Sequence, residues 1–388
     1  MAATDRDTRA AAAADRHAAG SIVMAALSLP GLLAGLLPPT ALADSAPEHA
    51  ELSFKTEHYQ DSQPGFQRIR IEEPAIYGLL PLGERWSLSG SAVYDVVSGA
   101  SPRYYSSVSG ASRVHEKRYS GDAEITYYGD RSSWGLSFAR SQEHDYISNS
   151  VSADGIVATA DNNTAINFGV SAARDRIDPT NDIVDNEHRT TYAGIVGLTR
   201  ALSSIDLVQV QGGYSSSHGY LSDPYKLFDN RPRRRNSGTG TVRWNHHIAD
   251  WSSTLRSSYR YYRDTYGLQS HTVDLQWVQP ISLRWILTPG IRYYTQNSAR
   301  FYVDPPANGA PFPTLPDGAE SSLDHRLSAF GALAPSLKLQ WHISEHWSTD
   351  LRGEFYQSRA AWRLIGEGSP GLERFQYYQV QFGLNYRF

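Results

Sequence analysis

The sequence predicts an all-β protein: a single antiparallel transmembrane β-barrel of about sixteen strands, without a plug domain. Three observations support this fold class. Apolar residues recur at every second position over segments of ten or more residues. Charged residues stand in the middle of the polar faces, as expected for a solvated lumen, and short connections alternate with long ones. A soluble β protein also alternates, but these charged faces and segment lengths favour the membrane barrel.

The composition narrows the class further. The chain has 388 residues, no cysteine and a formal net charge of -4, so disulfides and thiolate metal sites are excluded and nucleic acid is not an expected partner. It contains 24 Tyr and 9 Trp but only 2 Met. Tyr and Trp suit strands and membrane interfaces, where a ring meets water on one edge and apolar groups on its face.

The N-terminal region differs from the rest of the chain. A leader containing Arg6, Arg9 and Arg16 precedes an apolar stretch that ends in the small-x-small sequence Ala41-Leu42-Ala43. This pattern predicts an exported protein with a cleaved signal peptide rather than a membrane anchor. The predicted organisation is a signal peptide at 1–43, a short periplasmic segment at 44–51 and an outer-membrane β-barrel at 52–388.

Within the exported chain the strands follow one another with the two-residue period. In "YSGDAEITYY" the apolar side holds Tyr119, Ile125 and Tyr127, and the polar side holds Asp122 and Glu124. The same pattern recurs in "RWSLSGSAVYDV", "TAINFGVSA", "DWSSTLRSSYRYY" and "LKLQWHI". Successive side chains of a strand point to opposite faces, so each segment presents one apolar and one polar wall.

The connections between these segments set the strand number. Tight turns are expected near 81–84, 129–132, 161–163, 202–204, 249–250, 280–282 and 344–346. Wider loops are expected near 61–65, 99–117, 142–146, 178–188, 222–236, 264–268, 302–321 and 362–371. Their interleaving gives about sixteen strands, with fourteen as the fallback because 142–146 and 161–163 are the weakest connections. An even number places both termini on the periplasmic side.

The final segment alternates to the last residue. Its apolar side, which includes Phe382, Leu384, Tyr386 and Phe388, is expected to face lipid. This strand should pair with the first, near 52–59, because an open barrel would leave an unpaired edge in the membrane. The terminal aromatic pattern also resembles the signal that the barrel-assembly machinery reads.

Several long segments resemble the bacterial family catalogued as domain-of-unknown-function family 3570. They include "GERWSLSGSAVYDVVSGASPRYY", "DNNTAINFGVSAARDRIDP", "HGYLSDPYKLFDNRPRRR" and "SYRYYRDTYGLQSHTVDLQW". The resemblance implies an outer-membrane β-barrel without an established activity. The family's usual setting, among thioredoxin-like proteins and a flavin transferase, suggests periplasmic redox partners. It supplies no catalytic or ligand positions.

The predicted lumen carries the main candidates for a functional site. Arg260 and Asp274 are expected to be cross-strand neighbours around the loop at 264–268. The full set of lumen-lining candidates is Arg68, Arg70, Glu72, Asp95, Arg256, Arg260, Asp274, Arg292, Asp324 and Arg326. Opposed basic and acidic ladders create a transverse field that selects small charged solutes. The alternative is that these charges pair with one another and stiffen a closed barrel.

Charged loops offer weaker candidates. Arg231, Arg233, Arg234 and Arg235 form a basic run in a predicted external loop, where arginine would bind lipopolysaccharide phosphates. The alternative is a solvated loop. Asp178, Asp182 and Asp185 are a calcium candidate, but their spacing does not match the twelve-residue calcium loop, and an ordinary loop is the alternative. His144, His188, His218 and His271 lie towards the loop side without a metal-binding spacing.

An enzymatic function has little support in the sequence. Ser270-His271 and Ser217-His218 are adjacent pairs, and adjacent strand residues face opposite ways, so neither pair forms a nucleophile and its base. No cofactor is expected. The sequence therefore predicts a pore for small polar or charged solutes, with outer-membrane lipid, lipopolysaccharide and the barrel-assembly machinery as partners. The alternatives are a closed scaffold barrel that presents its loops to partner proteins and, with less support, a membrane-embedded lipid hydrolase.

Overall fold

The computed structural model describes residues 45–100, 113–226, 228–304 and 318–388. Within these residues it contains sixteen β-strands and three short 3-10 helices. The strands are β1 (Glu51–Gln63), β2 (Phe66–Leu82), β3 (Trp86–Ala100), β4 (Arg113–Gly129), β5 (Ser132–Gln142), β6 (Tyr146–Ala158), β7 (Thr164–Ile177), β8 (Glu187–Ala201), β9 (Asp206–Gly219), β10 (Arg234–Ile248), β11 (Ser253–Asp264), β12 (Gln269–Pro280), β13 (Trp285–Gln296), β14 (Phe330–His342), β15 (Trp347–Arg359) and β16 (Phe375–Arg387). The helices are η2 (Ala249–Trp251), η4 (His325–Leu327) and η5 (Ala360–Trp362).

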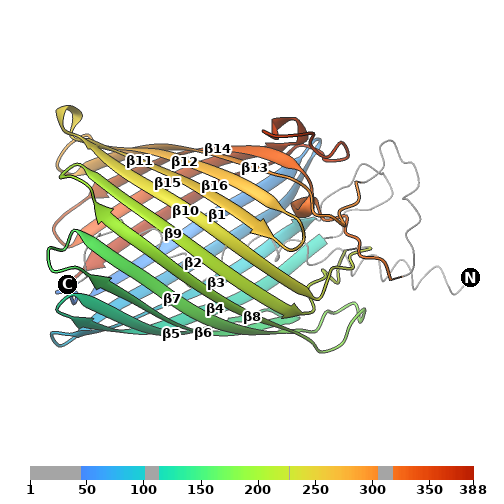
Figure 1. Ribbon diagram of the computed structural model, residues 1–388, viewed down its shortest axis with the longest axis horizontal. Coiled ribbons are helices and arrows are strands. Elements are labelled where there is room, and N and C mark those ends of the chain that lie inside the picture. The colour runs from blue at the N-terminus through green and yellow to red at the C-terminus, as the bar shows by residue number, and fades with distance from the viewer. Residues whose placement is uncertain (1–44, 101–112, 227, 305–317) are drawn as a thin grey trace, which may run out of the picture.

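The strands form one closed antiparallel barrel (Figure 1). Each strand pairs with the next in the chain, and β16 pairs with β1 to close the ring, with Leu52 opposite Tyr386 and Tyr59 opposite Gln379. The predicted fold class, the count of sixteen and the pairing of the last strand with the first are confirmed. Closure leaves no strand edge unpaired.

The two ends of the barrel differ. At one end, which we call the turn end, a short connection joins each even-numbered strand from β2 to β14 to the next strand. The C-terminus also lies at this end (left in Figure 1). At the other, the loop end, most connections are longer. The connections at 142–146 and 161–163 are both real, so the fourteen-strand fallback is wrong. The connection predicted as wide at 61–65 is instead tight: only Pro64 and Gly65 separate β1 from β2, and Gly65 has φ of +82°.

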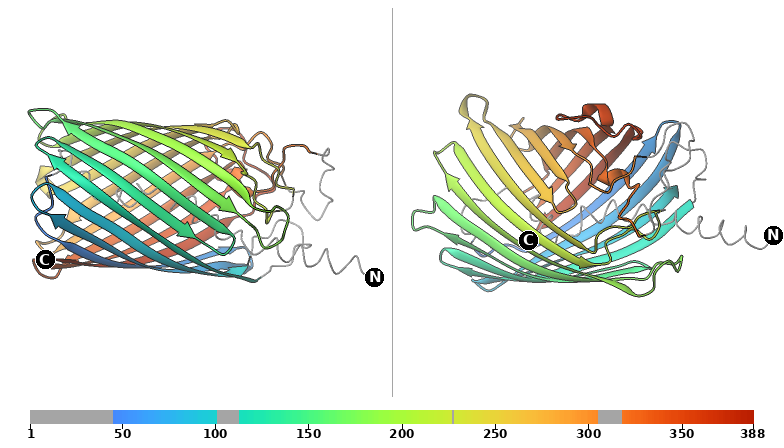
Figure 2. Two further views of the ribbon diagram at one scale, coloured as in Figure 1. Left: turned by 90° about the horizontal axis from the view of Figure 1, so that it is seen from below. Right: turned by 45° about the vertical axis from the view of Figure 1, so that its right-hand side comes forward.

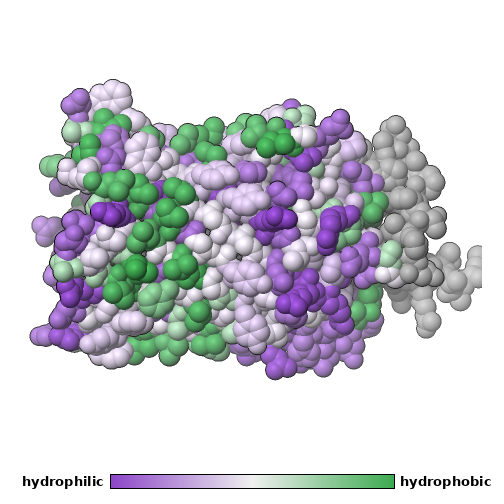
Figure 3. Space-filling view, viewed as in Figure 1, coloured by the Kyte–Doolittle hydropathy of each residue, from purple (hydrophilic) through white to green (hydrophobic). Residues whose placement is uncertain are grey.

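The two faces of the barrel wall follow the predicted alternation. Outward-facing apolar side chains are highly exposed, as for Leu136 (55%), Val170 (64%) and Leu337 (50%). The residues between them face the lumen. Figure 3 shows that apolar side chains gather on the half of the wall nearer the turn end, whereas the half nearer the loop end is mostly hydrophilic. Within the described residues, no helix is long and apolar enough to cross a membrane.

The largest cluster of buried apolar side chains lies among the loops. Tyr266, Leu268, Ala299, Phe301 and Leu327 pack together from the β11–β12 and β13–β14 connections. The rings of Tyr266 and Phe301 meet edge to face with centroids 4.9 Å apart, and the Tyr266 hydroxyl donates to the Pro232 carbonyl (3.0 Å). This packing holds three loops together over one part of the loop end.

Candidate functional site: a charged lumen beneath a loop cap

The lumen has two walls of opposite net charge, and Lys55 and Arg118 also face inward on the acidic side. We call the carboxylates on the inward faces of β1, β2, β3, β4 and β6 the acidic wall: Glu57, Glu73, Asp95, Asp122, Glu124 and Asp154. The cations on the inward faces of β10, β11, β13 and β14 form the basic wall: Arg243, Arg256, Arg260, Arg292 and Lys338. In a ring of sixteen strands, β3 and β11 are half a circumference apart. The two walls therefore face each other.

The basic wall is only partly neutralised. Arg292 Nε lies 2.6 Å from Asp274 Oδ1, and Lys338 Nζ lies 3.6 Å from Asp350 Oδ1. Arg243 instead donates to two neutral amides, those of Gln209 (2.5 Å) and Gln211 (3.3 Å).

Arg256 and Arg260 differ from these neighbours. Neither forms an ion pair with any residue that the structure describes, and both project inward from β11. Their charge is therefore available to the lumen.

The acidic wall contains a pair that is unfavourable for stability. Glu57 of β1 and Glu73 of β2 stand directly opposite each other on the inward face. Carboxyl groups in this position destabilise a sheet when both are ionised. On the next two strands Asp95 and Arg118 are both buried and form an ion pair across β3 and β4. Asp95 was predicted to face inward and does, whereas Glu57 and Glu73 were not predicted.

A β-bulge explains the misassigned residues of β2. Gln60 pairs with Arg70 and Ser62 with Gln67, so two residues of β2 stand opposite Asp61 alone. Arg68 is turned inward, where its Nε lies 3.7 Å from Asp61 Oδ1 and both side chains are fully buried. Arg70 and Glu72 share the outward face with Ile76, so their assignment to the lumen is wrong. They pair with each other at 2.7 Å on the outside of the barrel.

The inward assignments of Arg256, Arg260, Asp274 and Arg292 agree with the register, but one predicted pairing does not. Arg260 stands opposite Thr272, and Asp274 stands opposite Ser258 and Arg292. The register differs because the Asp264 carboxylate accepts hydrogen bonds from the backbone N–H groups of Tyr266 and Leu268, each at 3.0 Å. This capped turn leaves Asp264 outside the β11–β12 ladder.

Asp324 and Arg326 are not strand residues, contrary to the prediction. They lie in the β13–β14 loop, where Asp324 precedes η4 and Arg326 is part of it. The fully buried Asp324 carboxylate contacts Arg231 (2.8 Å) and Lys226 (3.8 Å) of the β9–β10 loop, and also Arg326. We call this assembly of the two loops the cap.

Contacts continue from the cap to β16, and from there to β2 and β1. The ring of His325 packs on Phe375, the first residue of β16, with centroids 6.0 Å apart. The guanidinium of Arg68 on β2 lies 5.1 Å from the centroid of the same Phe375 ring, and Arg68 in turn contacts Asp61 of β1. The chain of contacts thus runs from the β9–β10 connection to β1 and β2, about half the circumference away. Figure 2 (right) shows loop segments lying over this end of the barrel.

Burial and the charges of the cap determine the protonation states of Asp324 and His325. Burial raises the pKa of Asp324, but Arg326, Lys226 and Arg231 outweigh it and hold that pKa well below its usual range. Burial lowers the pKa of His325 to about 3, despite the opposing effect of the Asp324 carboxylate. At neutral pH the cap therefore contains an ionised Asp324 and a neutral His325.

The predicted external basic loop does not exist as one surface. Arg231 is buried in the cap and pairs with Asp229 (2.9 Å) and Asp324. Arg233 pairs with Glu187. Arg234 and Arg235 are the first residues of β10, and Arg235 faces inward against Asp264 (2.6 Å). Alternation and local ion pairs thus separate the four arginines.

The other candidate ligands are not brought together. Asp178 accepts hydrogen bonds from Arg176 (2.9 Å) and the Asn186 N–H (3.3 Å), and these donors occupy it in place of an ion. No group of three His, Cys, Asp or Glu side chains suited to a metal occurs in the part of the chain that the structure describes, and this includes His144, His188, His218 and His271. Ser270 is buried on the inward face of β12, whereas His271 faces outward and contacts Tyr259.

The closed antiparallel barrel has the fold of the outer-membrane β-barrel class. Solved structures with a similar fold include a bacterial polysaccharide outer membrane secretin (TM-score 0.51, 10% identity, 87% of this chain and 98% of that chain). Others are the translocator domain of autotransporter NalP from Neisseria meningitidis (TM-score 0.40, 12% identity, 95% and 96%) and a Pseudomonas aeruginosa FadL homologue (TM-score 0.40, 10% identity, 88% and 89%). At these identities the likeness concerns the fold alone.

The particular family is defined by sequence. The model of the family described as "Protein of unknown function (DUF3570)" matches residues 105–185 and 180–379, and the chain belongs to this family. The resemblance seen in the sequence is thereby confirmed. A search of curated proteins gives no match.

Proposed function

We propose that this protein is an outer-membrane pore that admits small polar or charged solutes and is restricted at its loop end by the cap. The lumen supports this proposal. Glu57 and Glu73 face each other at a cost in stability, and on the opposite side Arg256 and Arg260 carry charge that no described carboxylate neutralises. Acidic and basic walls that face each other produce an electric field across the lumen, which orients and selects charged solutes.

The proposed orientation follows from the asymmetry of the barrel. Membrane barrels have short periplasmic turns and longer external loops, so the turn end would face the periplasm and the cap the outside. The apolar belt near the turn end would lie in the bilayer (Figure 3). Export by a cleaved signal peptide and insertion by the barrel-assembly machinery belong to the same proposal. It includes no enzymatic activity, since Ser270 and His271 lie on opposite faces of β12.

The test is conductance of the refolded protein in a planar lipid bilayer. Discrete current steps are expected, and the double variant Arg256→Gln/Arg260→Gln should shift the reversal potential in a salt gradient towards cation selectivity. Arg263→Gln is a matched control, because Arg263 is an exposed arginine on the same strand that faces outward. An equal reversal potential in all three proteins would remove the basic wall from the mechanism.

A closed scaffold barrel is the second candidate, and the cap favours it. Buried ion pairs and the His325–Phe375 contact span the loop end, and such contacts also suit a sealed barrel that presents its loops to envelope partners. Periplasmic partners, which the family's association with redox proteins suggests, would instead meet the turn end. Folded, heat-modifiable protein that carries no current, with or without an intact cap, would support this function and exclude the pore.

A further inference from the structure

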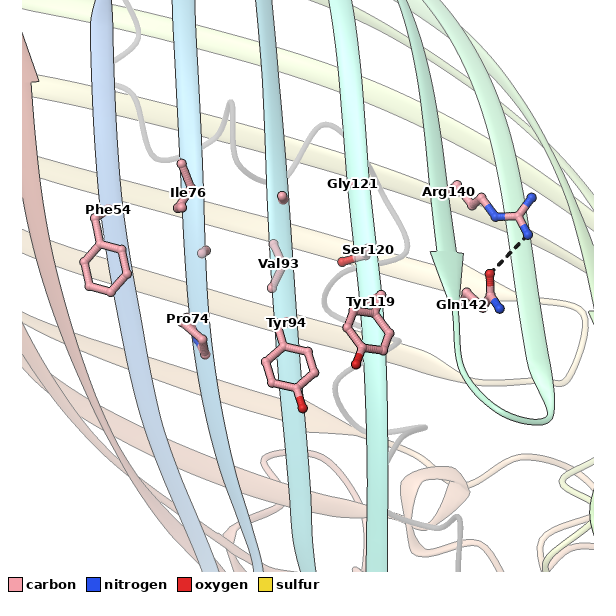
Figure 4. A pocket seen from close by; sticks show the side chains of 12 residues that line it. Phe54, Pro74, Ile76, Val93, Tyr94, Tyr119, Ser120, Gly121, Arg140 and Gln142 are labelled. Atoms are coloured by element: carbon pink, nitrogen blue, oxygen red, sulfur yellow. Dashed lines mark hydrogen bonds between the residues drawn. The ribbon is translucent and has the colours of Figure 1, made fainter.

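A groove crosses the outer surface of the barrel on the strands nearest the closure. It runs over β1 to β5 and has a volume of about 550 Å³. Its floor contains small residues, Ala92 and Gly121, and the rings of Phe54, Tyr94 and Tyr119 stand beside it (Figure 4). The Tyr94 and Tyr119 rings are 4.9 Å apart. An apolar, ring-bordered groove of this shape on an outward face suits a hydrocarbon chain rather than a polar solute.

Cations stand at one end of this groove. Arg140 lines it and lies two residues from the loop-side end of β5, opposite Gly121 in the register. On β4 the exposed Lys117 shares the outward face with Tyr119 and lies two residues nearer the loop end. Arg174 of β7 stands at the same level as Arg140, because both pair with Asn149 of β6. Arg140 and Arg174 therefore flank Asn149 on the outward face, and Lys117 lies nearer the loop end, four residues along β4 from the Gly121 opposite Arg140.

The surroundings of Arg140 contain no opposing charge. Its guanidinium donates to two neutral amides, Asn149 Oδ1 (3.4 Å) and Gln142 Oε1 (3.2 Å; dashed in Figure 4). Among the outward-facing side chains that the structure describes on β3 to β6, Lys117 and Arg140 are the charged ones, and both are cationic. The carboxylates of these strands, such as Asp122 and Asp154, face the lumen. Among the described outward side chains of β1 and β2, Glu72 is the one carboxylate, and it contacts Arg70 and His58, each at 2.7 Å.

We propose that this surface is a binding site for a phosphorylated, acylated glycolipid of the outer leaflet. An acyl chain lies in the groove between the aromatic rings, and a headgroup phosphate lies near Arg140, Lys117 and Arg174. Arginine binds phosphate through paired N–H groups, and the two amide contacts hold the Arg140 guanidinium in place. The inference rests on the outer-membrane location proposed above and does not depend on conduction.

The test uses purified, folded barrel in detergent and native mass spectrometry with added bis-phosphorylated lipid A. Lys117→Gln/Arg140→Gln should weaken binding about tenfold or more, because two charge-assisted contacts are lost. Ala92→Phe should weaken it as well by filling the groove, with the cations intact. Arg263→Gln, an outward arginine on the opposite side of the barrel, should bind as the unmodified protein does.

The outcomes are distinct. Equal lipid binding by the charge variant and the unmodified protein, both heat-modifiable, would overturn the site. Unchanged binding by Ala92→Phe together with full displacement by inorganic phosphate would show a simple phosphate site and also overturn it. Weak binding of dephosphorylated lipid A is the result expected if both parts of the ligand are recognised. Absence of the protein from the outer membrane would instead contradict the proposed location, whatever the binding result.

Discussion

At the turn end, neighbouring strands are joined by a few residues, and the wall carries an outward belt of apolar side chains. At the loop end, long connections leave the strands, fold over the opening and bind one another through buried ion pairs and rings. The half of the barrel nearer the turn end depends on the alternation of apolar and polar residues, in which many side chains are interchangeable. The loop half depends on single residues such as Asp324. Mutations should therefore be tolerated differently in the two halves.

The largest effect is expected in the cap. Asp324→Ala leaves Arg231, Arg326 and Lys226 without their shared carboxylate, and loss of one partner of a buried ion pair costs about 3–5 kcal/mol. The cap should loosen, giving faster trypsin cleavage after Lys226 and Arg326 and a larger current in bilayers.

Asp178→Ala is the control for this change, because Asp178 is a partly exposed loop carboxylate outside the cap. The Asp324 pKa is held below its usual range, so its contribution is present at neutral pH and is lost only as the pH falls through that lowered pKa. Unchanged cleavage of Asp324→Ala would show that the cap does not depend on this carboxylate.

A slightly smaller effect is expected from a charge on the apolar belt. Phe382→Arg places a cation on the outward face of β16, which costs about 2–4 kcal/mol near the middle of a bilayer. The adjacent Gln381→Arg points into the lumen and should be tolerated. Urea unfolding in lipid vesicles measures both. Equal stabilities would contradict the assignment of the two faces.

The next effect is pH-dependent. The packed cap lowers the pKa of His325 to about 3, against about 6.5 in a released loop, so the packed state is favoured above pH 6.5 and loses stability as the pH falls towards 3. At pH 5 this amounts to about 2 kcal/mol. Acidification from pH 7 to pH 5 should increase cleavage within the cap. His325→Phe should weaken this pH dependence, because the ring contact with Phe375 remains and the titrating group is removed.

The smallest effect on stability is expected at the C-terminus. Phe388 is 55% exposed and exchanges two backbone hydrogen bonds with Ala50, at 2.9 and 3.0 Å. Its deletion should cost about 1–2 kcal/mol in the folded barrel. If Phe388 also serves as the assembly signal, the amount of folded protein in outer-membrane fractions should fall by more than this loss explains. Substitution of the exposed turn residue Leu283 by Ser is the control.

The same comparison explains what the sequence could predict. The two-residue period is local, so it identified sixteen strands, the closure of β16 on β1 and the inward faces of Arg256, Arg260 and Arg292. The outward residues Leu80 and Leu82, followed back along β2, would also have placed Glu73 inward and Arg70 outward. Pro74 and Ala75 interrupt the alternation of apolar and polar residues in β2. The bulge opposite Asp61 then reverses which residues face inward, so the alternation does not assign Arg68.

The cap could not be predicted in this way. Asp324, Arg326 and Ser328 alternate with Leu327 and Ala329, so the sequence there imitates an alternating strand. Their positions depend on Arg231 and Lys226, which belong to the β9–β10 loop and are more than ninety residues away in the chain. Contacts between irregular loops leave no periodic pattern in the sequence.

The contacts from the cap through Phe375 to Arg68 and Asp61 have a mechanical consequence. A ring of strands resists stretching along its hydrogen bonds but flattens easily into an ellipse. At the loop end, this line of contacts acts as a strut between strands half a circumference apart and should resist flattening there. The described residues contain no comparable strut at the turn end. Fluctuations of the cross-section should therefore be largest at that rim, and a molecule that displaces His325 from Phe375 would change the shape of the whole barrel.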